Sequence, residues 1–145
     1  MRTIYFDMDG TIANLYGVDN WLAKLEAFDH SPYLDASPLV RLCVLARLLN
    51  KLQKNGYRIG IVSWLSKANN PFYNARVTAA KYKWLADHLP SVNFDEIIIV
   101  PYGTPKGEVV SDPNGILFDD EENNRVNWRG TAYDVDNIIE VLKGL

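Results

Sequence analysis

Residues 5–11 read YFDMDGT, and this stretch of the sequence decides the fold. It overlaps the hydrophobic segment 2–6, which is typical of a short β-strand and ends abruptly at Asp7. A turn alone would explain Gly10 and Asp9, because Asp and Gly often follow strands. It would not explain Asp7, since two carboxylates so close repel each other unless a cation lies between them. The stretch therefore predicts a functional site at the end of the first strand.

Strands and helices alternate along the rest of the chain. Strands are predicted at residues 57–62, 96–100 and 116–118, with a short edge strand at 131–133. Helices are predicted at 18–29, 38–55 and 74–88, and after Asp134, which caps the last helix. Residues 30–37 are expected to break the chain, because Ser-Pro occurs at 31–32 and again at 37–38, and 121–130 are expected to form a loop. This order predicts the α/β class, a parallel sheet with helices on both faces.

Polar residues follow several of the predicted strands directly. Asp7, Ser63 and the pair Asp119-Asp120 each come after a strand, and Lys106 lies in the loop after the strand at 96–100. In parallel sheets, ligands bind beyond the carboxyl ends of the strands. We therefore expect these residues at one edge of the sheet, although a strand-end acidic pair can also be a cap and most lysines are on the surface.

This set of residues suits phosphate transfer. A carboxylate and a phosphomonoester are both negative, so a metal must screen their repulsion, and Mg²⁺ prefers carboxylate and water oxygens. Asp7 could attack phosphorus to form an aspartyl-phosphate, and Asp9 could protonate the leaving oxygen and then deprotonate water. Ser63 and Trp64 are candidates for binding a phosphoryl oxygen, and Lys106 is the candidate fixed cation.

The four motifs together resemble those of the haloacid dehalogenase (HAD) superfamily of phosphatases. DMDGT at 7–11, Ser63, Lys106 and Asp119-Asp120 follow the family order. The resemblance implies a Rossmann-like sheet, a covalent aspartyl-phosphate and one Mg²⁺. It implies that Asp7, the backbone carbonyl of Asp9 and Asp120 bind the metal, with Asp119 acting through water or hydrogen bonds.

The second half of the chain is also similar to the 5′(3′)-deoxyribonucleotidases. The shared features are YKWL at 82–85, an Ile-Ile-Val strand, the loop with Lys106 and the bare Asp-Asp. Those enzymes carry a sizeable helical cap after the first motif, whereas here only about residues 13–37 are free to form one. Three aromatic residues in this segment either form a small apolar lid or pack it onto the body: Trp21, Phe28 and Tyr33.

Length and composition limit the remaining possibilities. The chain has 145 residues, 48% of them hydrophobic and 23% charged, which is typical of one globular domain spanning 1–145. The net charge of −3, without a basic block, argues against broad nucleic-acid binding. Cys43 is the only cysteine and is expected in the core, so no intrachain disulfide can form. No apolar run reaches the about 18 residues of a membrane helix, no signal-peptide pattern is present, and we expect a cytoplasmic location.

The leading hypothesis is a Mg²⁺-dependent phosphomonoesterase that acts on a nucleotide or another small phosphate ester. One alternative is a phosphatase for a phosphorylated macromolecule, such as a nucleic-acid 3′ end, because a small cap leaves an open site. Another is a non-catalytic binding domain with the HAD fold. Among the lysines, Lys106 is expected to matter most, whereas Lys67, Lys81 and Lys83 are expected to matter less. The oligomeric state stays open.

Overall fold

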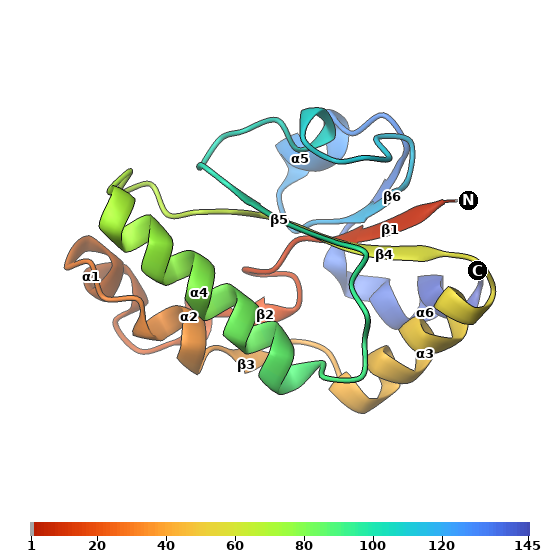
Figure 1. Ribbon diagram of the computed structural model, residues 1–145, viewed down its shortest axis with the longest axis horizontal. Coiled ribbons are helices and arrows are strands. Elements are labelled where there is room, and N and C mark those ends of the chain that lie inside the picture. The colour runs from red at the N-terminus through yellow and green to blue at the C-terminus, as the bar shows by residue number, and fades with distance from the viewer. Residues whose placement is uncertain (1) are drawn as a thin grey trace.

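A parallel sheet of five strands forms the centre of the protein (Figure 1). The computed structural model describes residues 2–145. The strand order is β5-β4-β1-β6-β7, with bounds Thr3–Phe6 for β1, Arg58–Trp64 for β4, Glu96–Val100 for β5, Ile116–Phe118 for β6 and Thr131–Tyr133 for β7. The central strand β1 is buried along its whole length, as expected for a hydrophobic strand covered on both faces.

Three helices cover one face of this sheet: α3 (Leu42–Lys54), α4 (Pro71–His88) and α6 (Ile138–Lys143). Successive side chains of a strand point to opposite faces, so Ile4 and Phe6 of β1 both enter this core. The buried face of α3 meets them with Leu45, Leu49 and Leu52, which recur at helical spacing.

The opposite face carries a smaller core. Tyr5, Val62, Leu117 and Trp128 pack there, covered by α5 (Glu122–Val126) and by the segment 101–115, which contains the short helix η2 (Lys106–Glu108). Gly60 makes room for Tyr5, because a Cβ at this position would lie 2.7 Å from the tyrosine ring. Figure 1 shows α5 on the side of the sheet opposite α3 and α6. The predicted α/β class, with helices on both faces, is confirmed.

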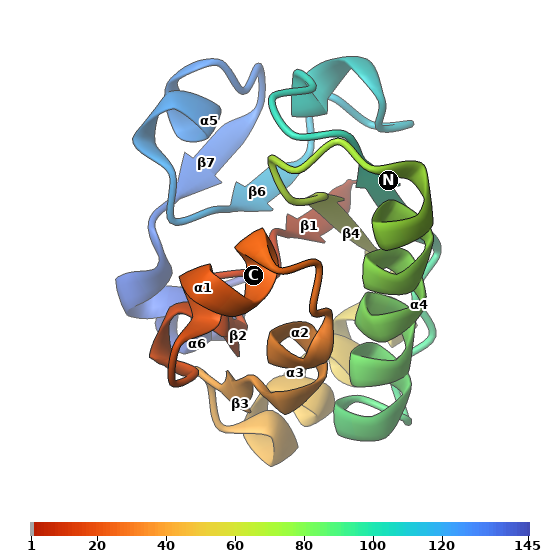
Figure 2. The same cartoon turned by 90° about the vertical axis from the view of Figure 1, so that its left-hand side faces the viewer.

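A small lobe is inserted between β1 and α3, and we call residues 13–38 the 13–38 segment. Its elements are β2 (Ala13–Asn14), η1 (Leu15–Gly17), α1 (Trp21–Glu26), α2 (Ser31–Asp35) and β3 (Ser37–Pro38). Figures 1 and 2 both show α2 beside α4, and α1 packs next to α2. Two hydrogen bonds tie the segment to α4: Tyr73 Oη donates to the Asp29 carbonyl at 2.9 Å, and Trp84 Nε1 donates to the Ala36 carbonyl at 2.8 Å.

Several local predictions need correction. Residues 30–37 do not simply break the chain, because Ser31–Asp35 form α2 with Pro32 in its first turn. The next helix begins at Leu42 and not at Pro38, because Ser37 and Pro38 pair with the distant strand β2. The loop expected at 121–130 contains the short helix α5.

Two further helices show what local sequence signals resolve and what they miss. Helix α4 begins at Pro71, where the Asn70 side chain accepts hydrogen bonds from the amides of Phe72 and Tyr73. Cys43 is exposed, so the expectation that it lies in the core is wrong; it falls outside the stripe of α3 that faces the sheet.

Among residues 2–145, no helix is both long and apolar enough to span a bilayer.

Candidate active site

The carboxyl edge of the sheet holds Asp7 and Asp119 side by side. Asp7 directly follows β1 and Asp119 directly follows β6, and the last residues of these strands, Phe6 and Phe118, are in register. The Asp7 amide donates to the Phe118 carbonyl at 2.9 Å, which extends the strand ladder to the aspartate itself. Strand pairing therefore positions both carboxylates.

Three carboxylates form an acidic cluster at this edge. Asp7, Asp119 and Asp120 each place an oxygen within 4.8 Å of the other two. The Thr11 hydroxyl lies 3.2 Å from Asp7 Oδ2 and 3.3 Å from Asp120 Oδ1, so it bridges two of them. Gly10 has a φ of +79°, and a Cβ there would collide with the Asp120 carboxylate. The glycine of the DMDGT motif is thus required by both its conformation and this close approach.

Like charges and burial disfavour ionisation of this cluster. Burial and the neighbouring charge of Asp7 raise the pKa of Asp120 to about 8 and that of Asp119 to about 6. A bound divalent cation would favour the charged forms. The cluster offers only oxygen donors, without histidine or cysteine, and this donor set suits Mg²⁺ better than Zn²⁺.

The two acidic residues of the second pair have different surroundings. The Asp119 side chain is fully buried, and Lys106 and Asn124 donate to its Oδ2 while the Glu121 amide donates to its Oδ1. Asp120 is only partly buried and faces a pocket. Asp119 therefore has both oxygens engaged, whereas Asp120 remains accessible.

Lys106 lies within the acidic cluster, buried at the start of η2. Its Nζ donates to Asp7 Oδ1 at 3.0 Å and to Asp119 Oδ2 at 2.6 Å, and it lies 5.3 Å from the centre of the Trp64 ring. Burial alone would lower the pKa of Lys106, but the charges of Asp7 and Asp119 outweigh it and raise that pKa. Two of the three N–H groups are used within residues 2–145, which leaves one for a ligand.

Asp9 faces a different lysine. Its Oδ2 accepts a hydrogen bond from Lys81 Nζ at 2.9 Å. Burial raises the pKa of Asp9 and the charge of Lys81 opposes this, while the charge of Asp7 raises it further. The Asp9 side chain is thus paired with Lys81 and is not a member of the three-carboxylate cluster.

Sequence reasoning grouped Lys81 with surface lysines, and that placement is wrong. The Lys81 side chain is 1% exposed, whereas that of Lys83, two residues later, is 63% exposed. A signal was present, because Lys81 shares a helical face with Tyr73, Val77 and Trp84, all of them buried. A charged residue on the apolar face of a helix is the pattern that could have revealed it.

Ser63 and Trp64 end the neighbouring strand β4 beside Lys81. The Ser63 Oγ accepts from Lys81 Nζ at 2.7 Å and the Trp64 carbonyl accepts from it at 2.6 Å. Ser63 is fully buried and does not line the pocket described next. The Trp64 indole N–H donates to the Thr104 carbonyl at 2.8 Å, which holds the loop that leads to Lys106.

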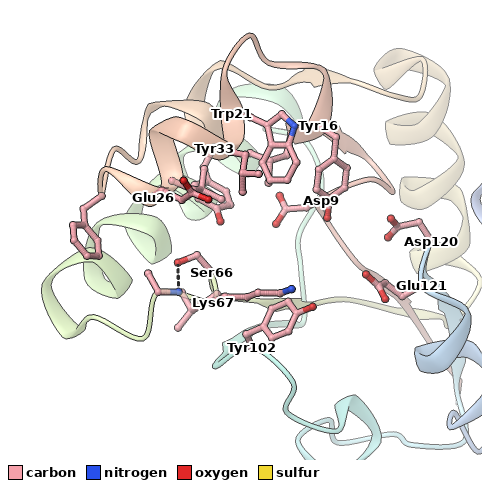
Figure 3. A pocket seen from close by; sticks show the side chains of 16 residues that line it. Asp9, Tyr16, Trp21, Glu26, Tyr33, Ser66, Lys67, Tyr102, Asp120 and Glu121 are labelled. Atoms are coloured by element: carbon pink, nitrogen blue, oxygen red, sulfur yellow. Dashed lines mark hydrogen bonds between the residues drawn. The ribbon is translucent and has the colours of Figure 1, made fainter.

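A pocket of about 740 Å³ opens next to Asp9 and Asp120 (Figure 3). Its apolar and aromatic lining comes mostly from the 13–38 segment: Leu15, Tyr16, Trp21, Leu22, Leu25, Phe28 and Tyr33, together with Leu65, Ala68 and Tyr102. Figure 3 shows Tyr16 and Trp21 on the side of Asp9, with Lys67 and Tyr102 across from them. The Tyr16 and Trp21 rings pack edge to face with centroids 4.9 Å apart. Of these aromatic residues, Tyr16 and Tyr102 were not predicted from the sequence.

Charged residues are sparse and mostly acidic around this pocket. Asp9, Glu26, Asp120 and Glu121 line it, and Lys67 is the one cation in its lining. The Lys67 Nζ lies 5.0 Å from the centre of the Tyr102 ring. The pocket therefore combines an apolar wall with acidic side chains, of which Asp9, Asp120 and Glu121 lie next to the acidic cluster.

Comparisons by sequence find no relative, as no protein-family model and no curated protein matches the chain. Solved structures do match. D,D-heptose 1,7-bisphosphate phosphatase from Burkholderia thailandensis superposes with a TM-score of 0.60 at 10% identity, over 99% of this chain and 97% of that one. The B. bronchiseptica enzyme of the same name, complexed with magnesium and phosphate, gives a TM-score of 0.53 at 13% identity, over 91% and 78%.

A chain of the Pnkp1/Rnl/Hen1 complex also matches, with a TM-score of 0.57 and 16% identity. The match covers 93% of this protein but only 45% of that chain, so this protein spans less than half of its length. At such low identities the likeness establishes the architecture. The protein therefore shares the α/β fold of the two heptose bisphosphate phosphatases and of the matching chain of that complex.

Proposed function

We propose that this protein is a Mg²⁺-dependent phosphatase of the HAD type, with Asp7 as its nucleophile. The observation that carries the proposal is the placement of Asp7: its carboxylate follows the central strand, contacts the buried Lys106 and lies beside Asp119 and Asp120. A carboxylate so arranged is held in place, and its negative charge is balanced on one side by a fixed cation. The fold shared with heptose bisphosphate phosphatases supports the same activity.

The metal would be held by carboxylates of Asp7 and Asp120 and by the backbone carbonyl of Asp9. The accessible position of Asp120 supports its role as a direct metal ligand. Both oxygens of Asp119 accept hydrogen bonds, so Asp119 would instead hold neighbouring groups such as Lys106 in place. When bound, Mg²⁺ supplies positive charge that screens the repulsion between the carboxylates and the phosphate.

The protein's own residues can carry out both halves of the reaction. An Asp7 oxygen attacks phosphorus while the bond to the leaving oxygen breaks, and the Asp9 carboxyl gives its proton to that oxygen. Asp9 then takes a proton from the water that cleaves the aspartyl-phosphate, which releases phosphate and restores Asp7. The raised pKa of Asp9 suits the first of these roles. The third N–H of Lys106 and the hydroxyl of Ser63 are the proposed donors to phosphoryl oxygens.

The pocket indicates the kind of leaving group. We propose that residues 1–145 act as one domain in which the 13–38 segment is a small cap, and that the pocket beneath it takes a flat apolar group. A volume of about 740 Å³ and several aromatic walls suit a nucleoside. The macromolecular alternative is less favoured, because the acidic lining would repel a polyanion such as a nucleic acid.

Phosphate release by the Asp7→Asn variant tests the activity. Removing the attacking charge should lower kcat/KM by several orders of magnitude while the circular dichroism spectrum stays unchanged. Asp87→Asn is the matched control, since Asp87 is exposed and pairs only with Lys83 among residues 2–145. Near wild-type turnover by Asp7→Asn would sink the proposed mechanism.

A substrate panel tests the leaving group. Mononucleotides should be hydrolysed with a lower KM than glycerol phosphate or phosphoserine, and Trp21→Ala should raise the KM for nucleotides alone. A 3′-phosphorylated oligonucleotide belongs in the same panel. If it is the best substrate, the macromolecular alternative replaces the nucleotide.

A further inference from the structure

The ammonium group of Lys81 has a complete set of hydrogen bonds within the protein. Its Nζ donates to Asp9 Oδ2 at 2.9 Å, to Ser63 Oγ at 2.7 Å and to the Trp64 carbonyl at 2.6 Å. A lysine ammonium has three N–H donors, so none remains for a substrate. Lys81 is therefore placed to hold other groups and not to bind the phosphate.

The position of Lys81 in the core makes a purely structural role a poor explanation. The side chain is 1% exposed, and the Tyr33 ring lies against it with its centre 5.1 Å from Nζ. Taking a charge out of water is costly, and replacing a buried ion pair with apolar residues of similar volume is often neutral or stabilising. A methionine here would be the simpler way to pack α4 against the sheet.

We infer that Lys81 is a positioning residue that fixes the carboxylate of Asp9 for proton transfer. One ammonium ties Asp9, which follows β1, to Ser63 and Trp64 at the end of β4. Without it, the Asp9 side chain would lose its only side-chain hydrogen-bond donor among residues 2–145. The inference rests on the proposed function, because it assigns Lys81 a part in that reaction.

The inference predicts a dependence on the leaving group. As the Asp7–phosphorus bond forms and the phosphorus–oxygen bond breaks, a poor leaving group needs the proton of Asp9, whereas dinitrophenolate departs without one. A misplaced Asp9 therefore slows the hydrolysis of phenyl phosphate and leaves that of dinitrophenyl phosphate largely unaffected. The ratio kcat/KM reports this step, since it covers events up to the departure of the leaving group.

The experiment compares Lys81→Met with Lys83→Met on these two substrates. Lys83 lies on the same helix, is largely exposed and serves as the matched control. For Lys81→Met we expect kcat/KM to fall by about 10²-fold or more with phenyl phosphate and by less than about tenfold with dinitrophenyl phosphate. Lys83→Met should leave both values unchanged. Equal losses on both substrates would overturn the inference, because a structural defect does not discriminate between leaving groups.

A double variant gives a second readout. If Lys81 acts through Asp9, adding Lys81→Met to Asp9→Asn should cost little beyond Asp9→Asn alone, whereas independent roles would give additive losses. Should Lys81→Met fail to fold, Lys81→Gln, which retains an N–H donor, is measured in the same way. An active Asp7→Asn variant would refute the proposed function itself. If Asp7→Asn is inactive but Lys81→Met lowers kcat/KM equally on both aryl phosphates, only the inference about Lys81 is refuted.

Discussion

Two buried lysines divide the site into two halves with different tasks. Lys106 donates to two carboxylates, Asp7 and Asp119, and retains one free N–H among the described residues. Lys81 donates to one carboxylate, Asp9, and to two neutral oxygens, and has no N–H left. The difference indicates that the number of unused donors, more than burial or charge, separates a lysine that can bind a ligand from one that positions a neighbour.

Trp64 links the two halves. Its ring lies beneath the Lys106 ammonium, with 5.3 Å between Nζ and the ring centre, and its carbonyl accepts from Lys81 at 2.6 Å. The indole also holds the loop before Lys106 through Thr104. Side-chain changes at Trp64 should therefore affect the Lys106 half and leave the backbone contact to Lys81 in place.

Metal removal should have the largest effect, and it should act mainly on the carboxylates of the Lys106 half. We expect EDTA to abolish phosphate release and Mg²⁺ to restore it, because the three carboxylates and a phosphate dianion repel one another without a cation. Mg²⁺ binding can be measured by the rise in melting temperature as Mg²⁺ is added. The Asp120→Asn variant should bind Mg²⁺ more weakly, and the Lys81→Met variant should bind it as the wild type does. Full activity after exhaustive chelation would contradict a metal-dependent mechanism.

Lys106→Ala should have the next largest effect. Losing one electrostatic stabiliser lowers kcat/KM by roughly 10²-fold or more. The loss should be similar for phenyl and dinitrophenyl phosphate, because Lys106 acts on the nucleophile and the phosphoryl group and not on the leaving oxygen. Steady-state kinetics on both substrates distinguishes this from the selective loss expected for Lys81. If Lys106→Ala were as active as Lys83→Ala, Lys106 would have no part in catalysis.

Trp64→Phe should have a smaller effect, a decrease in kcat/KM of about tenfold at most. The change deletes the hydrogen bond from the indole to the Thr104 carbonyl and keeps an aromatic ring near Lys106, so the loop loses one contact. The ratio of rates on the two aryl phosphates should match that of the wild type. A changed ratio would mean that Trp64 also acts on the half that contains Asp9.

Lys83→Met should have the smallest effect. Lys83 pairs with Asp87 at 2.8 Å, but both side chains are more than half exposed, at 63% and 53%, and surface pairs contribute little to stability. Activity should be unchanged and the melting temperature should shift by no more than a degree or so. A large loss of activity would remove the contrast between buried and exposed lysines on α4.

Local sequence was sufficient to predict the Lys106 half of the site. Asp7, Asp119 and Lys106 could be predicted to lie close together. Each follows a strand that its hydrophobic residues identify in the sequence, and the carboxyl ends of parallel strands lie at the same edge of the sheet. Within the DMDGT motif, Gly10 suits the turn after β1 because its φ is +79°, a conformation that favours glycine. These features depend on short-range patterns and on one topological rule.

Local sequence was not sufficient where distant segments decide the outcome. Helix α3 begins four residues later than predicted because Ser37 and Pro38 pair with β2, a contact that no local signal encodes. Cys43 lies in an apolar run, yet the direction from which the sheet packs on α3 leaves it exposed. In both cases the partner of the segment, and not its composition, determined the result.

By itself, the sequence determined the parallel sheet, the carboxylates at its edge and the chemistry that they favour. Only the tertiary structure decided that Lys81 is a buried partner of Asp9, because α4 must pack with Tyr33 on one side and the end of β4 on the other to enclose that ammonium. A lysine is ordinarily a surface residue, and its charge is accommodated in the core here because three oxygens, one after β1 and two at the end of β4, converge to accept its hydrogen bonds.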